Sequence, residues 1–131
     1  MRKYVLVICV LLMATSCENH LVNNAIDHIS RTWIVTKYEN DLIDETITFT
    51  TKYVDYSITF DVNQDYTENY IFLGSPVSIT GIYIFSMEAG ILTLSDEFQS
   101  RVYDIITLTD TEMTLLDLNS DTSETYYFIP Q

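Results

Sequence analysis

Residues 79–129 constrain the fold of this chain more than any other stretch, because apolar and polar side chains alternate along five short segments. A period of two residues is the pattern of a β-strand with one buried face. Polar turns separate the segments, and strands that recur roughly every 8–12 residues are typical of a barrel or a sandwich. We therefore predict an antiparallel meander with strands at residues 79–87, 91–95, 101–109, 113–118 and 124–129.

The first half of the chain supplies further strands that extend this meander into a closed barrel. Segments 31–40, 55–61 and 66–72 have strand patterns. The β-branched run 46–51 is also strand-like, but it has no evident partner. In the first of these strands, strict alternation places Lys37 on the same face as Trp33 and puts Tyr38 on the opposite face.

The N-terminus has the features of an exported chain. Arg2 and Lys3 precede an apolar run that is too short to span a bilayer and is typical of a signal peptide. The run ends in Ala14-Thr-Ser-Cys17, which resembles the lipoprotein box of bacterial lipoproteins. The resemblance implies cleavage before Cys17, a diacylglycerol thioether on its sulfur and an acylated N-terminus. The alternative is ordinary cleavage that leaves Cys17 as a free thiol.

The lipoprotein interpretation also sets the domain organisation and the location. With Cys9 removed in the signal peptide and Cys17 lipidated, the mature domain has no thiol for a disulfide or a metal site. We expect a signal peptide at 1–16, the lipidated cysteine with a tether and short helix at 17–30, and the barrel at 31–131. The expected location is the cell envelope, with the lipid on Cys17 anchoring the protein in the outer membrane.

A short helix is expected between the anchor and the barrel. Residues 20–30 present one apolar face at helical spacing, formed by Leu21, Val22, Ala25, Ile26 and Ile29. We expect this helix to lie across one opening of the barrel. The alternative is a frayed linker.

No metal site is expected. His20 and His28 are the only histidines, and on a helix they would lie about 12 Å apart, too far to share one metal. Segment 61–65 has oxygen ligands at alternate positions, like the start of a calcium loop. However, Tyr66 stands where that loop needs Gly and Phe72 where it needs Glu, and a hairpin turn explains the same residues.

The charge balance excludes some partners. The chain has 19 Asp and Glu against 6 Lys and Arg, a formal net charge of −13. Such a surface repels phosphate backbones and anionic headgroups, so we expect neither nucleic-acid binding nor adhesion to membranes through a basic face. The acidic surface is explained by the solubility of a small secreted domain.

Six short motifs occur in order along the predicted strands. They are Thr32-Trp33 with Tyr38, Ile58-Thr-Phe60, Gly81-x-Tyr83, Leu92-Thr-Leu94, Tyr103-x-Ile105 and Thr114-Leu-Leu116. Over roughly residues 29–129 they resemble the lipocalin-like domains found on many lipoproteins of the Bacteroidota. The resemblance implies an all-β fold, an antiparallel up-and-down barrel of about eight strands with a short N-terminal helix and Trp33 at its closed end. One departure is Arg31, because these domains usually have Gly two residues before the Trp.

The interior of such a barrel has two interpretations, because eight strands enclose space for one small ligand or for packed side chains. The candidate interior residues are aromatic: Trp33, Phe60, Tyr83, Phe85, Tyr103 and Tyr127. In the first interpretation they line a cavity for a small hydrophobic ligand, which the resemblance also implies. In the second they form a filled core, and a structural or interaction lipoprotein meets an unknown partner protein through loops 41–45, 96–100 and 119–123.

We expect no enzymatic activity, and therefore neither catalytic residues nor a cofactor. The sequence has no GxSxG, HExxH, P-loop or dinucleotide fingerprint. The adjacent carboxylates Asp44-Glu45 and Asp96-Glu97 point to opposite faces if they lie on strands, and on loops they are usually solvated.

Overall fold

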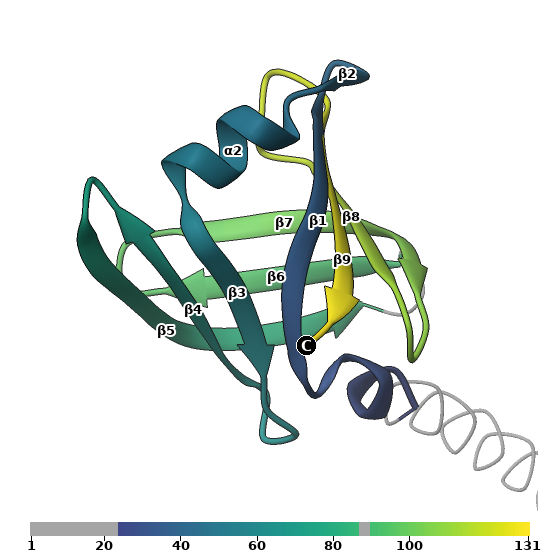
Figure 1. Ribbon diagram of the computed structural model, residues 1–131. Coiled ribbons are helices and arrows are strands. Elements are labelled where there is room, and N and C mark those ends of the chain that lie inside the picture. Colours follow the sequence, from purple (N-terminus) through teal and green to yellow (C-terminus); the bar gives the residue numbers. More distant parts are fainter. Residues whose placement is uncertain (1–23, 87–89) are drawn as a thin grey trace, which may run out of the picture.

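A single antiparallel sheet, closed on itself, dominates the computed structural model, which describes residues 24–86 and 90–131 (Figure 1). The strands are β1 (Thr32–Asn40), β2 (Ile43–Asp44), β3 (Val54–Phe60), β4 (Asp65–Phe72), β5 (Ser75–Ser86), β6 (Ile91–Asp96), β7 (Ser100–Leu108), β8 (Met113–Asp117) and β9 (Glu124–Pro130). Neighbours in the sheet follow chain order from β3 to β9, and β1 pairs with both β3 and β9. In the described part of the chain, β1 and β3–β9 therefore close an eight-stranded up-and-down barrel, as predicted.

The meander predicted for the second half of the chain is confirmed as β5–β9. Alternation gives the correct faces on β5, where Tyr83 and Phe85 are buried while Ile82 and Ile84 remain half-exposed. Leu92 of β6 is also fully buried, on the inner face. The inner face is thus apolar and aromatic, and the hydrophobic effect holds the barrel together through it.

The strand-like segment 46–51 is instead helical, which corrects the sequence-based interpretation. Helix α2 (Thr46–Lys52) begins where the Asp44 carboxylate accepts hydrogen bonds from the backbone N–H of Thr46 at 3.0 Å and from its hydroxyl at 2.6 Å. Its buried residue is Phe49, whose ring stacks on Tyr38 with 4.9 Å between centroids. Burial of Phe49 at the barrel mouth outweighs the weak β-propensity of the run, because tertiary packing routinely overrides propensity.

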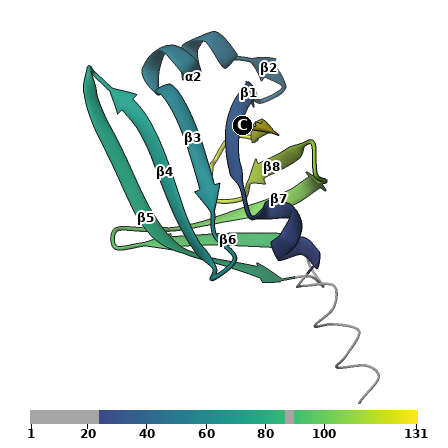
Figure 2. The same cartoon turned by 60° about the horizontal axis from the view of Figure 1, so that its bottom comes forward.

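The opposite end of the barrel is closed by the N-terminal helix (Figure 2). Residues 24–29 are helical, and Ala25 and Ile29 belong to the barrel core, so the helix expected at 20–30 covers an opening as predicted. Trp33 is fully buried beneath it and donates a 2.8 Å hydrogen bond from Nε1 to the carbonyl of Ile29. The expected cleavage and lipidation site at Cys17 lies outside the described residues, as does His20.

Arg31 stands where the resembling domains have glycine, and its side chain lies over Trp33. The guanidinium carbon is 5.7 Å from the centroid of the Trp33 ring. The guanidinium also donates to the Asp110 backbone carbonyl at 2.8 Å and to the Asp110 carboxylate at 3.0 Å. The Arg31 side chain therefore fits beside the barrel floor without disturbing it.

A β-bulge on β1 reverses the face pattern predicted for that strand. Val35 lies opposite Phe128 and Lys37 opposite Tyr127, so Thr36 is the extra residue. After the bulge, Lys37 points outward and Tyr38 points inward, where its ring meets Phe49 and Tyr126. The prediction that Tyr38 lies on the face opposite Trp33 is therefore wrong.

The buried core of the described chain lies between Ala25 and Phe128. The segment 18–131 thus carries every residue of that core and is expected to fold by itself. Among the described residues, no helix has the length and apolar character needed to cross a membrane.

Candidate ligand-binding cavity

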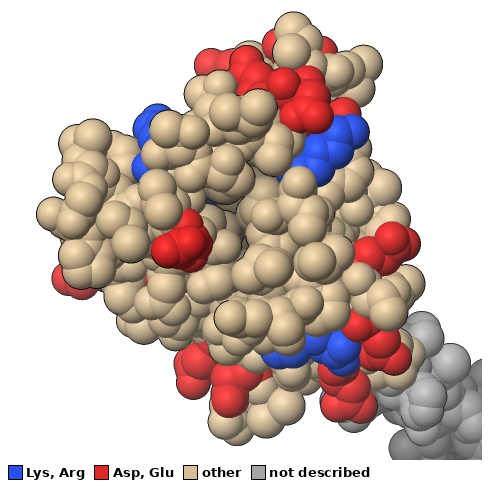
Figure 3. All heavy atoms as spheres, viewed as in Figure 1, with Lys and Arg blue, Asp and Glu red and all other residues tan. Residues whose placement is uncertain are grey.

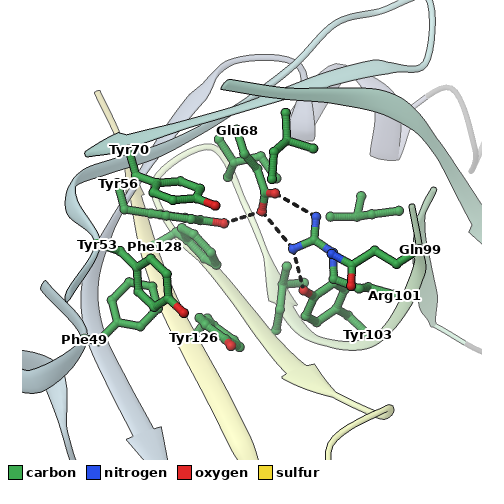
Figure 4. Close-up of a pocket in the computed structure, with 14 residues that line it drawn as sticks. Phe49, Tyr53, Tyr56, Glu68, Tyr70, Gln99, Arg101, Tyr103, Tyr126 and Phe128 are labelled. Atoms are coloured by element: carbon green, nitrogen blue, oxygen red, sulfur yellow. Dashed lines mark hydrogen bonds and ion pairs between the residues drawn. The ribbon is translucent and has the colours of Figure 1, made fainter. Parts of the chain in front are cut away.

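The barrel holds an internal cavity of about 200 Å³ beneath α2 (Figure 4). Aromatic rings form much of its wall: Phe49, Tyr53, Tyr56, Tyr70, Tyr103 and Tyr126. These residues come from α2, its C-cap position and strands β3, β4, β7 and β9, so the cavity exists only once the barrel has closed. A concave space lined by aromatic and aliphatic side chains with several polar groups is a common form of small-molecule site.

A buried ion pair lies at one side of this cavity. Arg101 of β7 donates from Nη1 to Glu68 Oε1 at 2.9 Å and from Nη2 to Glu68 Oε2 at 2.7 Å. The Glu68 side chain is 3% exposed and that of Arg101 is 19% exposed. A bidentate arginine–carboxylate pair is geometrically specific, and its two charges cancel within the interior.

Three tyrosines surround the ion pair. Tyr56 donates to Glu68 Oε1 at 2.5 Å, and Arg101 makes longer contacts with the hydroxyls of Tyr103 at 3.5 Å and Tyr66 at 3.4 Å. Along β4, the inward residues Tyr66, Glu68 and Tyr70 run from the packed core to the cavity wall. The ion pair therefore separates the filled half of the barrel from the half that contains the cavity.

Three tyrosines buried around the cavity, Tyr56, Tyr103 and Tyr126, remain protonated at physiological pH. Burial raises the pKa of Tyr56 well above its usual range, and the negative charge of Glu68 adds to the effect. Burial likewise raises the pKa of Tyr103, although Arg101 opposes it, and raises the pKa of Tyr126. For Arg101, burial is the largest single influence and lowers the pKa, but the hydrogen bond to Glu68 and the charge interactions with Tyr103 and Glu68 together raise it above its usual value, so the guanidinium stays charged. The cavity therefore offers phenolic donors beside a neutralised ion pair.

A groove connects the outside with this region of the barrel. β1 and β3 pair only where residues 32–34 face residues 57–59. Beyond that point a groove of about 490 Å³ lies between the two strands, and it shares Tyr53 and Tyr56 with the internal cavity. Figure 3 shows the surface hollowed beneath α2 at this place. Ligand access is thus expected between β1 and β3, past Tyr53.

The six predicted interior residues divide into three groups. Tyr103 lines the cavity. Four others lie in the packed core, between 0% and 8% exposed: Trp33, Phe60, Tyr83 and Phe85. Tyr127 does not face the interior. The structure therefore brings one of the six to the cavity and places four in the filled half of the barrel.

The placement of Tyr127 inside the barrel is wrong because its neighbours Tyr126 and Phe128 occupy the inner face of β9. Tyr127 lies on the outer face, where Lys37 Nζ is 5.0 Å from its ring centroid and its hydroxyl donates to Glu39 at 2.6 Å. Tyr126 takes the inner position and lines the cavity.

Sequence reasoning missed the ion pair that borders the cavity, although one signal was present. Arg101 is the sole basic residue after Lys52, and it lies two positions before Tyr103 on the same strand face. Glu68 lies two positions after Tyr66 and two before Tyr70, so alternation along β4 places all three side chains on the same face. A charged side chain on the same strand face as buried aromatic residues is itself buried, and it therefore needs a partner of opposite charge.

The described residues contain no cluster of three or more His, Cys, Asp and Glu side chains arranged to hold a metal. His28 instead lies at the surface, with Nδ1 2.9 Å from the carboxylate of Asp110. The calcium-like segment 61–65 forms the expected hairpin turn, in which the Asp61 carboxylate accepts from the backbone N–H of Asn63 at 2.8 Å.

The fold and the cavity together define a class of protein, a small up-and-down β-barrel with one end filled and one end hollow. A family profile described as lipocalin-like domain matches residues 29–115, and the chain belongs to that family. The match ends in β8, and β9 then completes the barrel by pairing with β1. A search of curated proteins finds no match.

Proposed function

We propose that this chain is a lipid-anchored lipoprotein of the cell envelope, of the kind carried by Bacteroidota, whose barrel binds a small hydrophobic ligand without enzymatic activity. The observation that carries the binding proposal is the 200 Å³ cavity beneath α2, with its aromatic wall and groove to the surface. Membership of the lipocalin-like family supports the same function.

Ligand binding is tested by native mass spectrometry of segment 18–131 purified from its own host. A stoichiometric small molecule that leaves on gentle activation supports the proposal. The matched control is Tyr53→Trp, which fills the cavity mouth with a larger ring and should lose the bound mass. An apo mass in the wild type, with no thermal shift from a panel of lipids and aromatic compounds, counts against ligand binding.

The anchor at the outer membrane is supported by the motif Ala14-Thr-Ser-Cys17. Metabolic labelling with a fatty-acid analogue should label the wild-type chain, and Cys17→Ala should abolish the label and release the protein from membranes. Ser16→Ala, a change at the neighbouring position to another small residue, is the control and should keep the label. A wild-type protein without label would contradict the lipoprotein assignment.

A second candidate function is favoured by a different observation, the exposure of large apolar side chains at loop tips. Leu42 in loop 41–45 is 85% exposed and Phe98 in loop 96–100 is 86% exposed. Exposed apolar groups at loops are a common feature of protein contacts. In this alternative the protein is a structural or interaction lipoprotein, and a photo-crosslinker placed at Phe98 in the host envelope should capture a discrete partner that the same group at exposed Glu112 does not.

A further inference from the structure

We infer that the cavity selects an uncharged, flat, ring-shaped molecule that carries a hydrogen-bond acceptor. This inference rests on the proposed ligand-binding function and deepens it by naming the class of ligand. It is carried by the charges, the free donors and the shape of the cavity beneath α2.

The charges of the wall exclude an ionic ligand. Among the described residues that line the cavity, Glu68 and Arg101 alone carry full charges, and each is bound to the other through two hydrogen bonds. A cation in this space would meet the guanidinium, and an anion would meet the carboxylate. Either would leave a charge without a partner in a water-poor interior, which is costly.

Most of the polar groups that remain available are donors, and the amide of Gln99, which also lines the cavity, adds both a donor and an acceptor. Nε of Arg101 is buried and has no hydrogen-bond partner among the described residues. The Tyr103 hydroxyl accepts only the 3.5 Å contact from Arg101, so its own hydrogen is not engaged within the described chain. Figure 4 shows the hydroxyls of Tyr53, Tyr70 and Tyr103 directed toward the middle of the pocket. A carbonyl oxygen or ring nitrogen on the ligand would satisfy these donors.

The shape of the cavity fits a molecule of one or two rings. A cavity of roughly 150 Å³ holds one benzene, and this one measures about 200 Å³. The rings of Tyr56 and Tyr70 lie 5.9 Å apart at 23° to one another, so they present nearly parallel faces. Phe49 meets Tyr56 edge-on, at 71°, and closes the space from α2. Flat aromatic walls favour a flat ligand, which stacks on them.

Four two-ring probes test the inference by calorimetric titration of segment 18–131. Coumarin is uncharged and carries a carbonyl acceptor, whereas naphthalene has a similar shape without the acceptor. Coumarin-3-carboxylate adds a negative charge, and N-methylquinolinium carries a positive one. We expect coumarin to bind about 3- to 10-fold tighter than naphthalene, the worth of one hydrogen bond. The two ions should give no heat beyond dilution.

A pair of variants assigns the effect to the cavity. Tyr103→Phe keeps the ring and removes the hydroxyl, so coumarin should weaken by about 3- to 10-fold while naphthalene keeps its affinity. Tyr127→Phe makes the same chemical change on the outer face of the barrel and should alter neither affinity. Tyr53→Phe provides a second hydroxyl deletion at the cavity, should Tyr103→Phe not give the wild-type melting curve.

The outcomes separate the inference from the function on which it rests. Binding of naphthalene as tight as that of coumarin, or binding of either ion, overturns the ligand class but leaves ligand binding intact. Equal loss of coumarin and naphthalene in Tyr103→Phe also overturns the role of the donors. If none of the four probes binds while the host-purified protein carries a bound mass, the ligand class is overturned and the binding function stands; if that protein is also apo, both fail.

Discussion

The two ends of this barrel have the same backbone architecture but different interiors. At the floor, the side chains are closely packed, and each of these four is at most 2% exposed: Ile29, Trp33, Phe60 and Tyr83. At the α2 end, the wall contains tyrosines and an ion pair around a cavity of about 200 Å³. A close-packed core stabilises the folded state, whereas a cavity lined by donors without hydrogen-bond partners lowers the stability of the fold. The difference indicates that the floor maintains the fold, whereas the α2 end holds the space in which the proposed ligand would bind.

The largest expected effect is on the floor. Trp33→Ala should lower the free energy of unfolding by about 3–5 kcal/mol, because it leaves a cavity in the close-packed core and removes the hydrogen bond to Ile29. Chemical denaturation of segment 18–131 measures the change. The matched variant at the other end is Tyr53→Ala, which should cost about 1 kcal/mol, since Tyr53 is only half-buried beside an existing cavity.

If Trp33→Ala and Tyr53→Ala lowered the free energy of unfolding equally, the proposed difference between the floor and the α2 end would be wrong. A loss below about 1 kcal/mol for Trp33→Ala would mean that Trp33 lines solvated space instead of the core. A loss of several kcal/mol for Tyr53→Ala would mean that the α2 end also maintains the fold.

The next effect is at the boundary between the two halves. Glu68→Gln removes one charge of the buried pair, and the cost should be about 2–4 kcal/mol. This loss of stability should be smaller than the largest losses found for broken buried ion pairs, because the Arg101 side chain is 19% exposed and can reach water. Urea denaturation measures it, with Glu97→Gln at an exposed turn as the control of unchanged stability.

A second substitution in the same protein tests the reason for that cost. Adding Arg101→Met to Glu68→Gln removes the unpaired guanidinium, so the double variant should recover at least part of the lost stability. A double variant less stable than Glu68→Gln would show that Arg101 contributes mainly through its other contacts, with Tyr66 and Tyr103.

A smaller effect is expected in alkaline solution, where the phenol of Tyr38 at the α2 end titrates. Burial and the charge of Glu124 raise the pKa of Tyr38 from 10.0 to about 12. The folded state therefore binds a proton more tightly than the unfolded state, and this contribution to stability is complete below pH 10 and is lost between pH 10 and 12. The melting temperature should fall across that window, with tyrosinate absorbance appearing together with unfolding. Full ionisation of the tyrosines at native circular dichroism would contradict the burial of the rings at the α2 end.

Much of the floor could be predicted from the sequence, because its signals are local. Alternation along β5 identified Tyr83 and Phe85 as inward, and helical spacing placed Ile29 against the barrel. The alternation of apolar and polar residues cannot assign the inner face of a strand when both faces carry residues of the same kind. Residues 126–128 are aromatic on both faces, so the sequence could not show that Tyr126 faces inward and Tyr127 outward. The bulge at Thr36 likewise has no sequence signal and reverses the face of Tyr38.

The α2 end was harder to predict because its features depend on contacts distant in sequence. Glu68 and Arg101 are 33 residues apart and meet only when β4 and β7 face one another across the closed barrel. The run 46–51 has β-propensity, yet it forms a helix because Phe49 finds its burial site between Tyr38 and Tyr126. The cavity is a product of these tertiary contacts, and no local pattern encodes it.

The smallest expected effect is a gain in stability at the α2 end. Leu73 is 88% exposed at the tip of the β4–β5 hairpin, with φ at 51°, in the left-handed region that leucine disfavours. Leu73→Asn should therefore raise the free energy of unfolding by about 0.5–1 kcal/mol, because asparagine accepts this conformation more readily. Leu118→Asn, at an exposed leucine without a positive φ, is the control and should bring no gain. A neutral or destabilising Leu73→Asn would mean that contacts at the hairpin compensate the strain. A gain confined to Leu73 would instead show that the strain at this hairpin tip is left unrelieved in the natural sequence.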